Sequence, residues 1–342
     1  MVCFERSPPK RCLSTLTPFR TTPGSLGSSV LDPIGSARSA ARTILDPPRA
    51  EPNDLGQPIL GDVPEGDTIH RTAAALRDAL GAGPITSFGA PGVPGPHPQP
   101  GESIDAVDAR GKHLLIRSAG GVTLHTHLGM SGSWRIGSAA HAPRPQVALG
   151  RPGVAARITT PIAVATCRSA SVVELLDDPT LARHPVLTSL GPDLCLPDPD
   201  LDEIALRLDT FVDPAAGIGV ALLDQRPASG IGNVYRSEVL WACRLHPATP
   251  LANVDGETRR KLYATANRQL RANLGGGPRR TYEGGIAVYR RAGRPCRRCG
   301  TPITSRRLGE QARSAWWCPT CQVIGRTEIS ARLGGDEAVK RV

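Results

Sequence analysis

Hydrophobic residues recur at helical spacing between residues 68 and 80, and this spacing predicts an amphipathic helix. The apolar stripe consists of Ile69, Ala73, Leu76 and Leu80. Asp67 stands directly before the stripe, where an N-cap residue is expected. Pro64 and Glu65 therefore lie at a helix entrance, a rigid position from which side chains can be directed at an anion.

Short apolar runs follow this helix and predict a region of antiparallel strands. The runs 112–117 and 122–126 flank Ala119-Gly120-Gly121, which is typical of a hairpin. Further strands are expected at 155–159, 162–167 and 171–175, whereas 90–101 is a loop rich in Pro and Gly. Strands at this spacing favour a β-sandwich.

From Leu201 onward the pattern becomes helical, so we predict a second domain after a linker at 192–200. Helices are expected to end near Phe211 and to cover 220–223, 233–241 and 255–274. The predicted fold class is therefore α+β with two domains: a β-sandwich domain with flanking helices at 63–191 and a helical domain at 201–283. Residues 326–342 are expected to form a flexible tail.

Residues 1–62 contain nine prolines, many Ser, Thr and Arg, and no sustained apolar period. Such a segment buries too little apolar surface to offset its ordering entropy, so we predict that it is disordered. Three explanations compete: a regulatory tail, a targeting peptide, or upstream sequence that is not normally translated. Val63 favours the third explanation. Bacterial translation can start at a GUG codon, which is read as Met when it initiates and as Val in a conceptual translation.

Composition narrows the class of protein. The 342 residues carry a net charge of +10, which favours a polyanionic partner. The sequence contains no apolar run long enough for a membrane span and no visible signal peptide. Of the nine cysteines, five are scattered, which suits reduced thiols in the bacterial cytoplasm better than a disulfide framework.

The remaining cysteines form two Cys-x-x-Cys pairs, Cys296/Cys299 and Cys318/Cys321, with 18 residues between them. Four thiolates at this spacing predict one tetrahedral Zn²⁺. Because four cysteines fill the coordination sphere, the zinc is expected to be structural. Eight arginines and a single acid, Glu310, lie around the pairs, so this module at 284–325 is suited to phosphate contact.

Four motifs together resemble the formamidopyrimidine-DNA glycosylase / endonuclease VIII family, and the wording is closest to its actinobacterial endonuclease VIII-like branch. They are Pro-Glu-Gly-Asp-Thr-Ile-His at 64–70, Arg-Gly-Lys-His-Leu-Leu at 110–115 with His-Leu-Gly-Met-Ser-Gly at 127–132, Gly-Ile-Gly-Asn-Val-Tyr-Arg-Ser-Glu at 230–238, and the cysteine module. The resemblance covers about 63–325. It implies a helix–two-turn–helix element in the second domain and a β-hairpin zinc finger after it.

The resemblance also implies an activity: a bifunctional DNA glycosylase and abasic-site lyase of base excision repair. The expected partner is double-stranded DNA with an oxidised base or an abasic site, bound by a monomer without a membrane. Pro64, as a free N-terminal amine, corresponds to the nucleophile and Glu65 to the catalytic acid. Lys112 completes the catalytic set and, with Asn233 and Arg313, corresponds to residues that hold phosphates. Met130 lies in the loop that fills the gap left by the everted base.

Each residue also has an ordinary alternative. Without the resemblance, Lys112 reads as a solvated lysine at a strand start, Asn233 as a helix N-cap and Met130 as a core methionine. His125 and His127 alternate on one strand face and, lacking a third ligand, are interpreted as structural. As written, an internal Pro64 has an amide nitrogen and cannot act as a nucleophile. We therefore expect the active form to begin at Pro64.

Parts of the sequence are compatible with two other functions. An internal Pro64 would favour a non-catalytic zinc-dependent protein that binds damaged DNA. Helical pairs with Cys₄ modules also occur in RNA- or ribosome-associated factors. Among lesions, the Pro-Glu-Gly-Asp wording favours oxidised pyrimidines, with 8-oxoguanine and formamidopyrimidines as the alternative.

Overall fold

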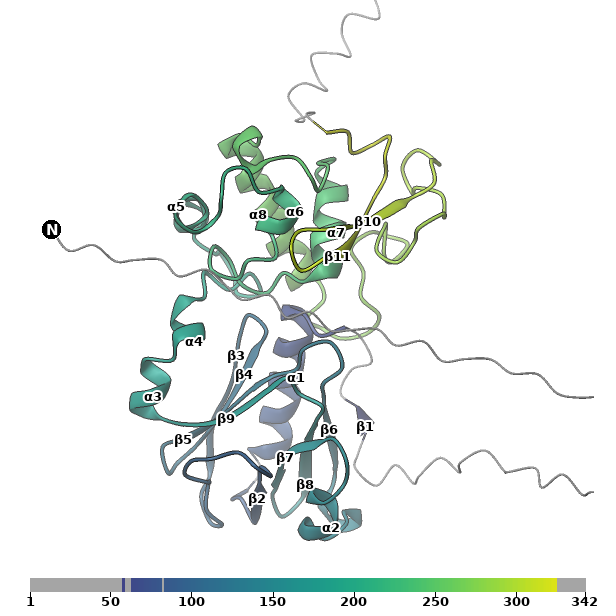
Figure 1. The fold of residues 1–342 in the computed structure, drawn as a ribbon. Coiled ribbons are helices and arrows are strands. Elements are labelled where there is room, and N and C mark those ends of the chain that lie inside the picture. The colour runs from purple at the N-terminus through teal and green to yellow at the C-terminus, as the bar shows by residue number, and fades with distance from the viewer. Residues whose placement is uncertain (1–56, 59–62, 82, 325–342) are drawn as a thin grey trace, which may run out of the picture. The chain divides into compact units, whose positions relative to one another are not determined.

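The computed structural model describes residues 57–58, 63–81 and 83–324 (Figure 1). The predicted tail at 326–342 lies outside the described residues, and so does the predicted extension at 1–62 apart from Gln57–Pro58. No helix in the described ranges is long and apolar enough to span a membrane.

The N-terminal half contains two antiparallel sheets. One has the order β1 (Gln57–Pro58), β6 (Ser133–Ser138), β8 (Ala163–Arg168), β7 (Val154–Thr159), β2 (Ser87–Gly89). The other has the order β3 (Ile104–Arg110), β4 (His113–Ser118), β5 (Val122–His127), β9 (Val172–Asp177). The predicted hairpin is confirmed, since β4 and β5 pair with Leu115 opposite His125. The loop at 90–101 contains neither helix nor strand, as predicted.

Helix α1 (Gly66–Leu80) packs against strands of both sheets, and Figure 1 shows it running between them. Its buried stripe joins one hydrophobic core with residues of both sheets, among them Leu114 and Ile158. This shared core explains why the amphipathic period is so clear: the stripe must cover apolar residues over the length of the helix.

The start of α1 corrects one expectation. Asp67 is not the N-cap: the helix begins at Gly66, and Glu65 occupies the cap position with an extended backbone. The backbone carbonyl of Glu65 accepts a hydrogen bond from Ile69 at 3.1 Å. Asp67 is displaced from the capping role because its carboxylate binds the guanidinium of Arg279, far away in the sequence.

The C-terminal half is helical and ends in a hairpin. Its elements are α5 (Leu201–Phe211), α6 (Ile218–Ala221), α7 (Asn233–Ala242), η2 (Leu251–Asn253), α8 (Gly256–Arg271), β10 (Thr304–Leu308) and β11 (Arg313–Trp317). Shorter helices in the first half are η1 (Ala139–His141), α2 (Pro145–Leu149), α3 (Asp178–Ala182) and α4 (Pro185–Ser189). The predicted helical segments are confirmed, and a second core forms around α5, α7 and α8.

Two segments make backbone contacts that their sequence pattern does not predict. Gln57–Pro58, inside the segment predicted to be disordered, pairs with β6. The segment 192–200, interpreted as a linker, is held by backbone hydrogen bonds to Ser229, which donates to Pro192 and accepts from Leu194. The first residues of the linker therefore form a strand-like contact with the turn before α7.

Candidate active site

The N-terminal ends of α1 and α7 meet at the predicted catalytic acid. The carboxylate of Glu65 accepts hydrogen bonds from the backbone N–H groups of Gly232 (3.0 Å), Val234 (2.7 Å) and Tyr235 (3.2 Å). Gly66 donates to the carbonyl of Gly230 at 2.9 Å and fixes the two entrances together. Free N–H groups at a helix start favour an anion, which explains why an acid is tolerated here.

Glu65 is only 1% exposed, and burial raises the pKa of its carboxyl group. Arg279 and Lys112, together with the N–H groups of α7, act in the opposite direction but do not cancel the effect of burial. A carboxyl group with a raised pKa keeps its proton to higher pH and is suited to donate it. Pro64, directly before it, is half-buried.

Arg279 completes this corner and was not predicted from the sequence. Its guanidinium donates to both carboxylate oxygens of Asp67, at 2.9 and 2.7 Å, and to the hydroxyl of Thr68 at 2.9 Å. It also lies 5.2 Å from the ring centre of Tyr235. A two-pronged pair of this kind is directional as well as strong, so Arg279 fixes the first turn of α1 against α7.

Lys112 lies at the turn between β3 and β4 and faces the same corner. Its Nζ donates to the carbonyl of Ile231 at 2.8 Å. Burial lowers its pKa to about 8; Glu65 opposes this effect and Arg313 adds to it. Lys112 is therefore partly buried and coupled to the site, and the alternative of a solvated lysine is wrong.

Arg236 contacts both Asn233 and the backbone of the residue after Arg313. Asn233 is the first residue of α7, and the N-cap position belongs to Gly232, so the N-cap alternative for Asn233 is wrong. The Arg236 guanidinium donates to the side-chain oxygen of Asn233 and, at 2.5 Å, to the carbonyl of Ser314, next to the exposed Arg313 in β11. Sequence reasoning missed Arg236, although it belongs to the quoted motif.

Met130 stands in the loop between β5 and β6 and is 84% exposed, so the alternative of a core methionine is wrong. His127 ends β5 three residues earlier. Its pKa is lowered to about 4, first by burial and then by the charges of Lys112, His125 and Arg313, so His127 lies close to these three residues. The sequence reading treated His127 as structural, although the motif that contains Met130 also contains it.

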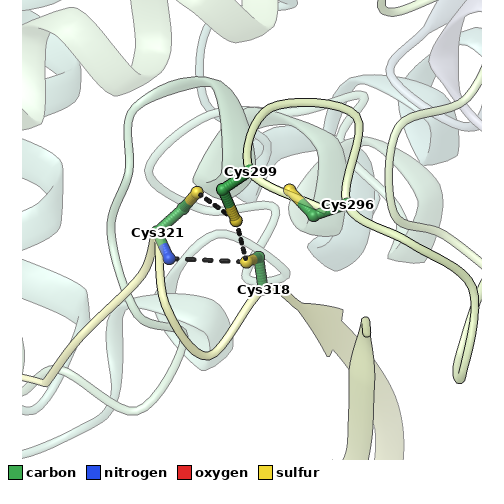
Figure 2. Close-up of side chains that lie close together, drawn as sticks. All are labelled: Cys296, Cys299, Cys318 and Cys321. Carbon is green, nitrogen blue, oxygen red and sulfur yellow. Dashed lines mark hydrogen bonds between the residues drawn. The ribbon is translucent and has the colours of Figure 1, made fainter. Parts of the chain in front are cut away.

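The four predicted cysteines converge, and Figure 2 shows their sulfur atoms turned toward one another. The Sγ atom of Cys299 lies 3.4 Å from the Sγ atoms of both Cys318 and Cys321. Two sulfurs bound to one tetrahedral zinc would lie about 3.8 Å apart, so the cluster fits a zinc ion with small adjustments. Trp241 Nε1 and the backbone N–H of Arg298 both donate to Cys296 Sγ at 3.4 Å, contacts that suit a thiolate.

Two family models match consecutive parts of this chain. The formamidopyrimidine-DNA glycosylase N-terminal domain matches residues 63–159, and the formamidopyrimidine-DNA glycosylase H2TH domain matches residues 190–281. The chain belongs to the formamidopyrimidine-DNA glycosylase family. The resemblance inferred from the motifs is thereby confirmed, and the second model covers the turn and helix that hold Glu65.

Relatives within the family carry endonuclease 8 names. The chain is 36% identical over 280 residues to a probable endonuclease 8 2 of Streptomyces coelicolor, covering 80% of this chain and 98% of the relative. It is 37% identical over 273 residues to the DNA-(apurinic or apyrimidinic site) lyase Nei2 of Mycolicibacterium smegmatis, covering 76% of this chain and 99% of the relative.

Solved structures of the family share the fold. A Lactococcus lactis formamidopyrimidine-DNA glycosylase bound to DNA with an AP site has a TM-score of 0.63 at 21% identity, covering 76% of this chain and 99% of that one. A MutM complex with carbocyclic 8-oxo-G DNA has a TM-score of 0.62 at 21% identity, covering 76% and 100%. The predicted two-domain arrangement of sheets and helices is therefore confirmed.

Proposed function

We propose that this chain is a bifunctional DNA glycosylase and abasic-site lyase of base excision repair, acting on double-stranded DNA at the bacterial nucleoid. One observation carries the proposal. Glu65, the residue after Pro64, is buried at the N-terminus of α7 with a raised pKa, and Lys112 lies close enough to influence that pKa. The relatives named as endonuclease 8 and as an abasic-site lyase support this assignment.

In the proposed reaction, the amine of Pro64 attacks C1′ of the damaged nucleotide, the bond from C1′ to the base breaks, and the base leaves with a proton. A terminal amine has a pKa of roughly 8, so a useful fraction is neutral near pH 7. Glu65 protonates the sugar ring oxygen, the ring opens, and an iminium forms. The iminium acidifies C2′, so loss of its proton expels the 3′ phosphate; a second elimination expels the 5′ phosphate.

This chemistry requires Pro64 as the free N-terminal residue, because an amide nitrogen has no available lone pair. We therefore propose that the catalytic form begins at Pro64. The first family model matches from residue 63, which supports this boundary. The proposed domains are then 63–191, a linker at 192–200, 201–283 and the zinc module at 284–325.

Phosphate contacts from Lys112, Asn233 and Arg313 would hold the backbone on either side of the lesion. Lys112 and Arg313 are coupled by charge, and Asn233 and Arg313 are linked through Arg236. Met130, exposed at a loop tip, would enter the space left by the everted base. His127 lies close to Lys112 and Arg313, whose charges lower its pKa, and is a further candidate for a phosphate contact.

The cysteine cluster is proposed to bind one structural Zn²⁺ through Cys296, Cys299, Cys318 and Cys321. When bound, the zinc would fix the β10–β11 hairpin that carries Arg313. The convergence of four sulfur atoms in the cluster supports this assignment. For the lesion, we propose oxidised pyrimidines, in keeping with the endonuclease 8 names of the relatives; 8-oxoguanine and formamidopyrimidines are the second candidates.

Borohydride trapping on abasic-site DNA tests the proposal. A form whose first residue after the removed Met is Pro64 is compared with the full 342-residue chain, whose intactness is checked by mass spectrometry. The expected result is a covalent adduct with the short form only. An adduct with both intact forms would assign the nucleophile to another amine, such as Lys112. DNA binding without any adduct would instead favour a non-catalytic damage-binding protein.

A further inference from the structure

A second cluster of potential metal ligands lies on the four-stranded sheet, away from the cysteines. It contains His113 from β4, His125 and His127 from β5, Glu174 from β9, and His184, which caps α4. The strand register creates it: His113 lies opposite His127, and His125 lies opposite Glu174. A small separate hydrophobic core lies beside this cluster. It is formed by Leu115 of β4, Leu176 of β9 and Leu187 of α4.

Three donor atoms of this cluster converge. Oε2 of Glu174 lies 2.8 Å from Nδ1 of His125 and 3.1 Å from Nε2 of His184, and all three atoms lie within 4.8 Å of one another. Donors bound to one tetrahedral zinc at about 2.0–2.1 Å lie about 3.3 Å apart. The three atoms therefore need only small movements to share one ion.

We propose that His125, Glu174 and His184 form a second metal site, which takes a divalent transition metal such as Zn²⁺. Two imidazoles and one carboxylate suit Zn²⁺, Co²⁺ or Ni²⁺ rather than Mg²⁺, which prefers oxygen ligands. Glu174 is 41% exposed at its side chain, so an ion enters from solvent, whereas the His125 side chain is 2% exposed.

The surroundings favour the ligand form of these groups. Burial lowers the pKa of His125, so its imidazole is neutral near pH 7. Burial raises the pKa of Glu174, but hydrogen bonds from His125 and His184 outweigh it and the net pKa is lowered, so the carboxylate is ionised. His113 Nδ1 lies 2.9 Å from His125 Nε2, the kind of contact that orients a metal-bound histidine from its other nitrogen.

One contact sets the strength of the site. Nδ1 of His184 accepts the backbone N–H of Leu187 at 3.2 Å and caps α4. Ligation through Nε2 places the proton on Nδ1, so metal binding breaks this cap. The site is therefore weaker and more exchangeable than four thiolates, and occupancy loosens the first turn of α4 while joining it to β5 and β9.

Titration of Zn²⁺ into the full chain, with the cysteine site already filled, tests the proposal by calorimetry. We expect one further equivalent to bind. In Glu174→Gln and His184→Gln its affinity should fall at least tenfold, and in the matched control His141→Gln, an exposed histidine outside the cluster, it should not change. A wild-type chain that binds no further equivalent, or a Glu174→Gln chain that still binds it, overturns the proposal.

Cobalt provides a second measurement that does not depend on the variants. Co²⁺ added to the zinc-loaded wild-type chain should give visible bands without the near-ultraviolet charge-transfer band of a thiolate ligand. A thiolate band would mean that the added ion enters the cysteine cluster, which contradicts a separate histidine–carboxylate site. Circular dichroism of each variant checks that the fold is retained.

Discussion

The carboxylate of Asp193 accepts a hydrogen bond from the backbone N–H of Gly111 at 2.7 Å, one residue before Lys112. The same oxygen lies 2.8 Å from Nε2 of His70 in α1, and the other oxygen accepts the N–H of Cys195 at 2.9 Å. One acid at the start of the linker thus joins α1 and the β3–β4 turn to the second half of the chain, and positions the backbone of Lys112.

Asp193→Asn should destabilise the protein by about 1–3 kcal/mol, because an amide NH₂ group must then face a backbone donor in a buried site. Asp198→Asn, in an exposed part of the same segment, is the matched control. Urea unfolding measures the free energy of unfolding of the wild type and of both variants. If Asp193→Asn is as stable as the wild type, Asp193 does not hold the two halves together.

The same group gives a dependence on pH. Burial raises the pKa of Asp193, but His70 and the two N–H groups outweigh it and the net pKa is lowered. Its contribution to stability is therefore complete above its ordinary pKa of 3.8 and is lost as the pH falls through the lowered value. The stability difference between wild type and Asp193→Asn should shrink in that acidic range.

Glu65→Gln should lower the single-turnover rate of base release about 100-fold or more while DNA affinity changes little, because general acid catalysis is lost. Glu102→Gln is the control, since that carboxylate also accepts backbone N–H groups but lies in a surface turn. Because burial raises the pKa of Glu65, the wild-type rate should persist above pH 4.5 before it falls. A Gln variant with the wild-type rate would remove Glu65 from the mechanism.

Lys112 should take up a proton when DNA binds. Its pKa in the free protein is lowered to about 8, and a nearby phosphate would raise it, so binding at pH 8–9 should consume protons. Calorimetry in buffers of different ionisation enthalpy measures this uptake, which should vanish in Lys112→Gln and remain in Lys261→Gln on α8. Its absence in the wild type would exclude a close phosphate contact.

The lowered pKa of Lys112 also makes its contribution to folding stability depend on pH. The folded-state pKa of Lys112 lies below its ordinary value of 10.5, so the contribution to stability is present above that value and is lost as the pH falls toward 8. The burial cost of the charged lysine is therefore fully expressed at neutral pH. Lys112→Gln should consequently be less destabilising at pH 7 than at pH 10.

Arg236→Gln should weaken DNA binding about as much as Arg313→Gln, because it frees both Asn233 and the β11 backbone from their shared partner. The combined variant should be little weaker than Arg236→Gln alone, since the second change removes a contact that is already lost. Arg260→Gln on α8 is the control. Fully additive losses would show that Arg236 does not position Arg313.

Cys318→Ser should lose zinc and DNA affinity while the N-terminal half stays folded, because Cys318 is buried in the cluster that supports the hairpin. Cys243→Ser is the matched control: its sulfur contacts the Thr265 hydroxyl at 3.7 Å, so a serine retains a partner. Metal analysis and binding to abasic-site DNA measure both variants. Unchanged affinity in the zinc-free variant would separate the hairpin from phosphate contact.

Local pattern was sufficient for α1, α8 and the β4–β5 hairpin, because their apolar residues face a single core at regular spacing. It failed for β3 and β6. In β3, Asp105 and Asp108 interrupt the apolar run, and in β6, Gly137 and two serines dilute it. Both strands exist because their neighbours supply ladder hydrogen bonds, which a single segment does not reveal.

The residues of the site differ in the same way in how far the sequence predicts them. Local sequence motifs contain Pro64, Glu65, Lys112 and the cysteines. The residues that hold them in place lie far away in the sequence. Arg279 lies 212 residues after Asp67, and Asp193 lies 82 residues after Gly111. An arginine after a glycine run and an aspartate in a linker have no local signal, since their partners are set only by the folded chain.

The contact between Glu65 and α7 has one further consequence. The three N–H groups that donate to this carboxylate, those of Gly232, Val234 and Tyr235, belong to the second half of the chain. The acid is therefore surrounded by these donors only while the two halves remain together. If they separate, water reaches the carboxyl group and its proton affinity returns toward that of a free glutamate. The pKa of the Glu65 carboxyl group therefore reports whether the two domains are closed, and spectroscopy can follow it without any substrate.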